Sequence, residues 1–158
     1  MTYRAGAAAA SAAMLAAWTL FAGCAAARDV GSVIVAENPS ARSAQEKLGY
    51  SEAIIAGDTI YLSGVVAVPR AGDQGPEPAF ERMFERIEAT LRRAGATFDD
   101  VVEMTSYHVD MAGQIDAFVL VKHRYVKAPF PAWTAVGNAQ LYRGDAVAEV
   151  RIVARKAN

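Results

Sequence analysis

The sequence predicts an α+β domain, in which two helices cover one face of a mixed sheet. Three observations predict this class. Short β-rich runs flank a turn near the start of the domain, and similar runs follow at its end. Two stretches with a helical apolar stripe lie between them, separated by one β-rich segment. The chain has 158 residues, a length that suits one domain.

The first pair of strands is predicted to form a β-hairpin. Residues 53–55 and 59–63 are rich in β-branched and apolar side chains, and Gly57 and Asp58 supply the turn between them. A polar loop containing glycine and proline is expected over residues 69–78.

The clearest helix is predicted from Phe80 to Ala94, where Gly95 ends it. Charged residues cover the face opposite its apolar stripe, which is typical of a solvated surface. The stripe consists of Phe80, Met83, Phe84, Ile87, Leu91 and Ala94.

The second half of the chain is predicted to contribute one central strand, one helix and two closing strands. Residues 101–109 alternate and form the strand, and the helix covers residues 114–126. Pro129 and Pro131 prevent the helix from continuing. The closing strands are expected at residues 133–139 and 146–154, with a turn between them at residues 142–145.

The first 27 residues are Ala-rich and resemble a secretory leader. Residues 20–24 resemble a bacterial lipobox that ends at Cys24, so lipidation of this cysteine is expected to anchor the mature protein. Cleavage after Ala27 would instead give a soluble exported protein, and a misassigned start codon would leave it cytoplasmic. Residues 28–49 are predicted to be a polar lead-in with one short apolar run, ahead of a domain covering 50–158.

Composition narrows the classes of ligand. The net charge is −1, with acidic and basic residues interspersed, so nucleic-acid binding is not expected. Cys24 is the sole cysteine, and His108 and His123 are the two histidines. No metal site or cofactor is therefore expected, and both histidines are interpreted as structural or surface residues.

Several short motifs occur in order along residues 50–155. They are Gly57-Asp58-Thr59-Ile60-Tyr61-Leu62-Ser63-Gly64, Ala94-Gly95-Ala96-Thr97-Phe98-Asp99-Asp100-Val101-Val102, Asp110-Met111, Phe130-Pro131-Ala132-Trp133-Thr134, and Leu141-Tyr142-Arg143-Gly144-Asp145 with Glu149. Together they resemble the RidA family (YjgF-type) of imine and enamine deaminases. The resemblance implies a chorismate-mutase-like fold and a homotrimer, in which three sheets form a central barrel with ligand clefts between subunits.

The resemblance places Glu149 where the family carboxylate activates or positions the attacking water. Hydrolysis of a C=N bond requires a group that accepts the proton of that water. Glu149 is therefore the candidate catalytic residue. The alternative is a rim carboxylate that pairs with Arg151 or Lys156.

Trp133 lies where the family usually has the arginine that binds the substrate carboxylate. An indole has one N–H and cannot replace a bidentate guanidinium. Trp133 either fills the vacated space or forms a stacking wall for an uncharged or aromatic ligand.

Five further residues are expected at the ligand cleft because of the resemblance. Val119 replaces a polar residue that many members carry there. The remaining four match family positions that border the ligand, and they are Tyr50, Ser63, Gly64 and Thr134.

The sequence therefore predicts a RidA-like hydrolase of a small imine, enamine or related C–N substrate, with non-standard specificity. The alternative is a non-catalytic trimeric protein that binds a small metabolite at the cell envelope.

Overall fold

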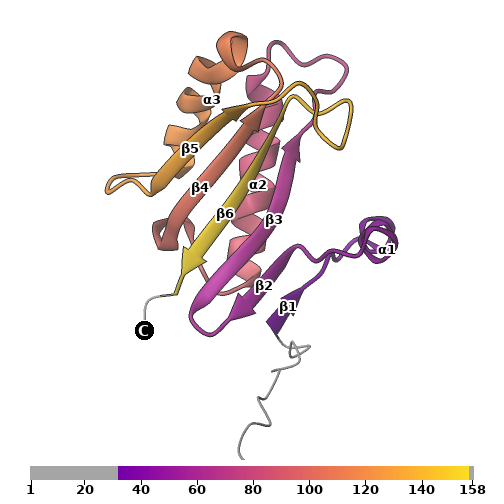
Figure 1. The fold of residues 1–158 in the computed structure, drawn as a ribbon, viewed down its shortest axis with the longest axis vertical. Coiled ribbons are helices and arrows are strands. Elements are labelled where there is room, and N and C mark those ends of the chain that lie inside the picture. Colours follow the sequence, from indigo (N-terminus) through magenta and orange to yellow (C-terminus); the bar gives the residue numbers. More distant parts are fainter. Residues whose placement is uncertain (1–31, 157–158) are drawn as a thin grey trace, which may run out of the picture.

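The computed structural model describes residues 32–156 and contains a six-stranded mixed sheet with the strand order β1-β2-β3-β6-β4-β5 (Figure 1). The β4–β5 pair is parallel, and the other neighbouring pairs are antiparallel. The strands are β1 (Val33–Ile34), β2 (Ala53–Ala56), β3 (Thr59–Ala67), β4 (Val101–His108), β5 (Ala132–Gly137) and β6 (Ala148–Arg155). The helices are α1 (Pro39–Leu48), α2 (Glu77–Arg93) and α3 (Met111–Tyr125).

Helices α2 and α3 pack side by side on one face of the sheet, whereas α1 lies beyond the β1–β2 corner (Figure 1). The core lies between the sheet and these two helices. Its largest fully buried side chains include Phe80, Phe84, Phe118, Ile60, Met83, Met104 and Ile152. None of the described helices covers the opposite face of the sheet, which we call the open face.

The predicted hairpin is confirmed as β2 and β3, which pair from Ala56 opposite Thr59. Gly57 occupies the turn with φ of 64°, a left-handed conformation that glycine adopts without steric cost. Helix α2 begins at Glu77, three residues earlier than predicted, and includes Pro78. Proline is tolerated in the first helical turn, because the N–H it lacks has no partner there.

Helix α1 and strand β1 fall in the predicted polar lead-in, for which only a short apolar run was noted. Asn38 caps α1 by accepting hydrogen bonds from the N–H groups of Ser40 and Ala41. Gly49 ends the helix in a left-handed conformation, with φ of 72°. Gln45 is the one buried residue of α1, so the helix has no apolar stripe from which it could be predicted.

The second half of the domain matches the predicted elements with small shifts at their ends. Helix α3 begins at Met111 because the Asp110 side chain accepts a hydrogen bond from the Gly113 N–H and caps it. The closing strands are confirmed as β5 and β6. The predicted leader and Cys24 lie outside the described residues. Within residues 32–156 no helix is both long and apolar enough to cross a membrane.

Candidate active site

Glu149 projects onto the open face from the start of β6, a central strand of the sheet. Strand β6 lies between β3 and β4, and Val66 and Tyr107 are the residues in register with Glu149 on each side. Side chains alternate along a strand, so the buried Ala148 and Val150 face the helices while Glu149 faces away from them. The carboxylate therefore lies, half-buried, between the side chains of two neighbouring strands.

Gly64 leaves the space that the Glu149 carboxylate occupies. The register of β3 against β6 shifts between Leu62 and Val65, and Gly64 lies in this bulge. A Cβ atom on Gly64 would lie 2.6 Å from Cδ of Glu149 and closer still to its Oε1. Any larger residue at this position would therefore displace the carboxylate.

Among the residues that the structure describes, the carboxylate of Glu149 has no charged partner. Within residues 32–156 no group forms a hydrogen bond or ion pair with it, so the predicted alternative of a pair with Arg151 or Lys156 is not what the structure shows. Burial raises the pKa of Glu149 above the usual carboxyl value. A carboxylate with a raised pKa is a stronger proton acceptor, as a general base requires.

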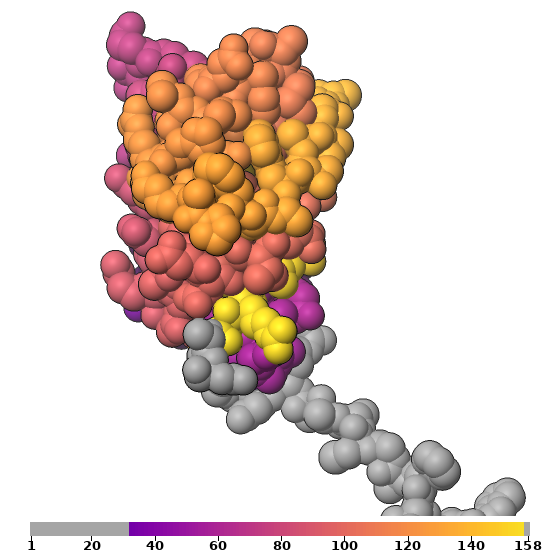
Figure 2. All heavy atoms as spheres, turned by 90° about the vertical axis from the view of Figure 1, so that its left-hand side faces the viewer, coloured from indigo at the N-terminus to yellow at the C-terminus, as the bar shows by residue number. Residues whose placement is uncertain are grey.

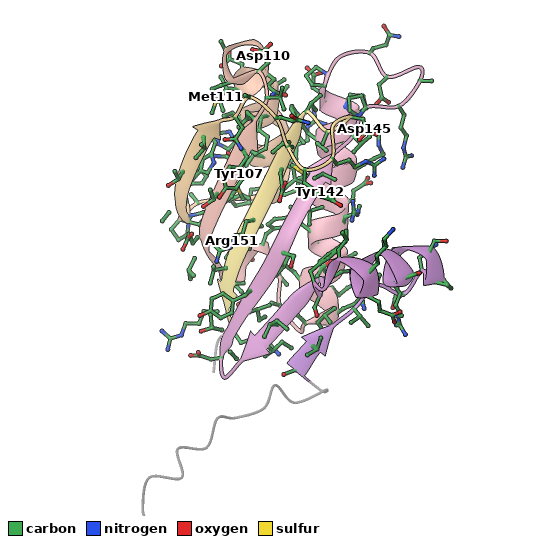
Figure 3. The ribbon with its side chains drawn as sticks, turned by 45° about the vertical axis from the view of Figure 1, so that its right-hand side comes forward. Tyr107, Asp110, Met111, Tyr142, Asp145 and Arg151 are labelled. Carbon is green, nitrogen blue, oxygen red and sulfur yellow. The ribbon has the colours of Figure 1, made fainter. Side chains whose placement is uncertain are left out.

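Polar side chains surround Glu149 on the same face of the sheet. Arg151 follows it by two residues on β6 and is in register with Thr105, which is in turn in register with Thr134 of β5. In Figure 3, Tyr107 and Arg151 lie over the central strands. Thr134, expected at the cleft, thus shares a face with Glu149, with β4 between the two strands.

Ser63 and Tyr50 line a neighbouring cleft of about 550 Å³, between α1 and the β2–β3 hairpin. The Ser63 hydroxyl donates a hydrogen bond of 2.6 Å to the backbone carbonyl of Ser51, which ties β3 to the segment before β2. Tyr50 is exposed at the end of α1. Ser63 directly precedes Gly64, so the cleft lies next to the bulge below Glu149.

Trp133 lies on the helix side of the sheet, opposite the face that carries Glu149. Its Nε1–H donates a hydrogen bond of 2.9 Å to the Ser106 hydroxyl, and its ring stacks on Phe118 of α3 at 5.9 Å between centroids. The Lys122 ammonium lies 3.5 Å from the centroid of the indole ring. The indole therefore fills space between β5 and α3.

Val119 also belongs to α3, which packs on the helix side. Within one protomer, the structure thus brings Glu149 and Gly64 together and leaves Val119 and Trp133 on the other face. A cleft that contained all of them would need two protomers.

His108 is a core residue. It is fully buried, its Nε2 lies 3.0 Å from the Ser106 hydroxyl, and its ring packs edge-on against Phe118. Burial lowers its pKa, which favours the neutral imidazole. His123 is exposed and stacks on Phe130. Within residues 32–156, no group of three or more histidine, cysteine, aspartate or glutamate side chains is arranged to hold a metal ion.

Tyr107 and Arg151 were not among the predicted site residues. The alternation of side chains along a strand could have placed Arg151 on the same face as Glu149. The position of Tyr107 depends on the register between β4 and β6, for which the sequence carries no signal.

Comparison with known proteins agrees with this fold. The sequence model of the family described as Endoribonuclease L-PSP matches residues 40–156. The RutC family protein YjgH of Escherichia coli is 40% identical over 111 residues, which cover 67% of this chain and 82% of YjgH. A 2-iminobutanoate/2-iminopropanoate deaminase of Dermatophagoides farinae is 29% identical over 96 residues, 58% of this chain and 74% of that protein.

Solved structures with the same fold include a structural-genomics structure of YjgH. It has a TM-score of 0.66 and 32% identity, covering 80% of this chain and 96% of that one. RidA from the Antarctic bacterium Psychrobacter sp. has a TM-score of 0.61 and 25% identity, covering 81% of this chain and 97% of that one. The fold is thus that of the YjgF and RidA proteins. The chain belongs to the RidA family.

Proposed function

We propose that this protein hydrolyses the C=N bond of a small imine or of the imine tautomer of an enamine. The observation that carries the proposal is the half-buried Glu149 carboxylate, which has no partner among residues 32–156 and lies over Gly64 on the open face. The family membership and the deaminase name of the mite relative support the same reaction class.

In the proposed reaction, Glu149 accepts a proton from water as the water oxygen bonds to the imine carbon. The π electrons of the C=N bond move to nitrogen, which takes up a proton from solvent. The resulting carbinolamine then expels ammonia, and its hydroxyl becomes a carbonyl group by releasing its proton to solvent. The raised pKa of Glu149 suits both steps, since the carboxyl group first accepts a proton and can then return it to the departing amine.

We infer that the substrate specificity differs from that of the 2-iminobutanoate/2-iminopropanoate deaminase of Dermatophagoides farinae. The position where the family usually has its carboxylate-binding arginine is Trp133, whose N–H is already bonded to Ser106. Imines whose one anchor is the carboxylate next to the C=N carbon, such as 2-iminopropanoate, are therefore expected to be poor substrates.

A screen of freshly generated imines tests the proposal. An amino-acid oxidase produces each imine in the assay, and semicarbazide traps whatever has not been hydrolysed. Wild type should lower the trapped imine for some member of the panel, and Glu149→Ala should not. If ligands stabilise the protein but every imine survives, the non-catalytic binding alternative replaces the enzyme.

The assembly and location belong to the same proposal. A homotrimer would cover part of the open face and place ligand clefts between protomers.

From residues 20–24 we propose a lipid anchor at Cys24 of an exported protein. Membrane fractionation should retain the wild type and release Cys24→Ser, and equal release of both would exclude the anchor.

A further inference from the structure

Two arginines follow Glu149 on the open face of β6, and they differ in how their guanidinium groups are used. Arg155 donates a 2.7 Å hydrogen bond to the carboxylate of Asp58, which lies in the turn between β2 and β3. Among residues 32–156, the guanidinium of Arg151 has one polar contact, with the Glu103 carboxylate at 3.5 Å. The fork of Arg151 therefore remains largely available, since a guanidinium carries five N–H donors.

The contact between Arg151 and Glu103 is too weak to hold the arginine in place. The two side chains are 44% and 50% exposed, and pairs this exposed contribute little to stability because water screens them. Arg82, by contrast, donates hydrogen bonds from its guanidinium to both carboxylate oxygens of Asp73 and to the Val68 carbonyl, so its donors are largely occupied. A ligand anion can thus displace Glu103 from Arg151 at small cost.

The geometry sets where such an anion would lie. Residues two apart on a strand are separated by roughly 6.6 Å, so Arg151 lies one side-chain row below Glu149. Its guanidinium is directed further away, towards Glu103, whose partner in register on β6 is Val153. An anion bound by Arg151 therefore lies several bonds from a carbon attacked above Glu149. Thr105, in register with Arg151, borders the path between them.

We propose that Arg151 binds a second carboxylate of the substrate, and that the preferred substrates are imino acids with a distal carboxylate. This inference rests on the proposed imine hydrolysis for its catalytic consequence. Arg151 supplies a cation that can anchor the substrate on the same face as Glu149. Trp133 does not provide one, because it is uncharged and its N–H is bonded to Ser106 on the helix side.

Two imines with the same five-carbon chain isolate the distal charge. The glutamate-derived 2-iminoglutarate carries the distal carboxylate, and the norvaline-derived 2-iminopentanoate has a methyl group there. For the full-length wild type, kcat/KM should be at least about tenfold higher for 2-iminoglutarate, the size of a charged hydrogen bond. Arg151→Gln should abolish this preference by raising KM for 2-iminoglutarate, and circular dichroism checks that the variant is folded.

Arg155→Gln is the matched control, because Arg155 lies on the same strand and face as Arg151 but its guanidinium is bonded to Asp58. It should keep the preference for 2-iminoglutarate. Glu103→Gln should keep or strengthen it, since the competing carboxylate is removed. A preference that survives in Arg151→Gln, or that is lost equally in Arg155→Gln, overturns the inference.

Binding of the product separates this inference from the proposed reaction. Calorimetry should show that 2-oxoglutarate binds the wild type at least about tenfold more tightly than 2-oxopentanoate does, and that Arg151→Gln removes the difference. If wild type hydrolyses neither imine yet shows this difference in binding, the hydrolase proposal fails and the Arg151 site stands. If binding shows no difference, the Arg151 site is wrong whatever the enzyme hydrolyses.

Discussion

Gly64 and Glu149 occupy complementary positions on neighbouring strands, because the absent side chain of the first makes room for the carboxylate of the second. The bulge in β3 and the central position of β6 together produce this contact. The contact explains in steric terms why a residue without a side chain lies at position 64.

Gly64→Ala should disable the site while leaving the domain folded. The new Cβ would overlap the Glu149 carboxylate, which must rotate away from the bulge. Hydrolysis of the best imine in the screen should fall by about a hundredfold, the scale of losing a positioned general base. Circular dichroism checks the fold. Gly144→Ala is the matched control, because nothing lies within 4 Å of a Cβ there. Retained activity in Gly64→Ala would mean that the carboxylate is not needed where it lies.

Stability should depend on pH through Glu149 with a defined sign. Burial raises its pKa, so the folded protein keeps the proton at a pH where the unfolded chain has released it. The protonated group contributes its full stabilisation of the fold below the pKa of the unfolded chain, about 4.3. This stabilisation is lost as the pH rises through the pKa of the folded protein. The Tm of Glu149→Gln minus that of wild type should therefore increase between pH 4 and pH 8. A constant or falling difference would show that the carboxyl is not held in a desolvating environment.

Replacing Trp133 with the usual family arginine should destabilise this protein. Lys122 is 7% exposed and lies against the indole, and burial already lowers its pKa. A guanidinium in place of the ring would put a second cation beside this ammonium. Trp133→Arg should lower the free energy of unfolding by about 2 kcal/mol or more, and adding Lys122→Met should restore part of it. Strictly additive effects in denaturant titrations would contradict the pairing of Trp133 with Lys122.

The open face should be an interface between copies of this chain. Tyr61 is 44% exposed there and is in register with the apolar Val153. Sedimentation should give three protomers for wild type and a smaller species for Tyr61→Glu, because an interface does not bury an unpaired charge. Tyr142→Glu is the control, since this exposed tyrosine lies on the loop that joins β5 to β6 and not on a strand (Figure 3). The β5 edge and α3, seen in Figure 2, form another side of the molecule and should not be affected. A monomeric wild type would remove the intersubunit cleft from the account.

The sequence predicted the elements whose periodicity is strong and missed those that depend on capping alone. Helix α2 has an apolar stripe over several turns, and this spacing predicts a helix. Helix α1 has one buried residue, Gln45, and is defined by Asn38 and Gly49 at its ends. Such local caps are visible in a sequence but do not by themselves predict a helix.

The sequence named candidate site residues but did not predict which face of the sheet each one occupies. Glu149 and Gly64 were both expected there, and their contact depends on a bulge that the sequence does not reveal. Trp133 was expected at the same cleft, yet within the protomer its hydrogen bond to Ser106 and its stacking on Phe118 place it on the helix side. Strand register decides which face a residue occupies, and a shift of one residue reverses it.

The most direct test of the account is the rate of imine hydrolysis by Glu149→Gln, measured on the best substrate of the wild type. Glutamine keeps the shape of the side chain and its place over Gly64 but is not a general base. The account predicts that kcat falls by about a hundredfold or more while the oligomeric state and fold are retained. A Glu149→Gln protein that hydrolyses the imine at the wild-type rate would contradict the central claim that this carboxylate directs the attacking water.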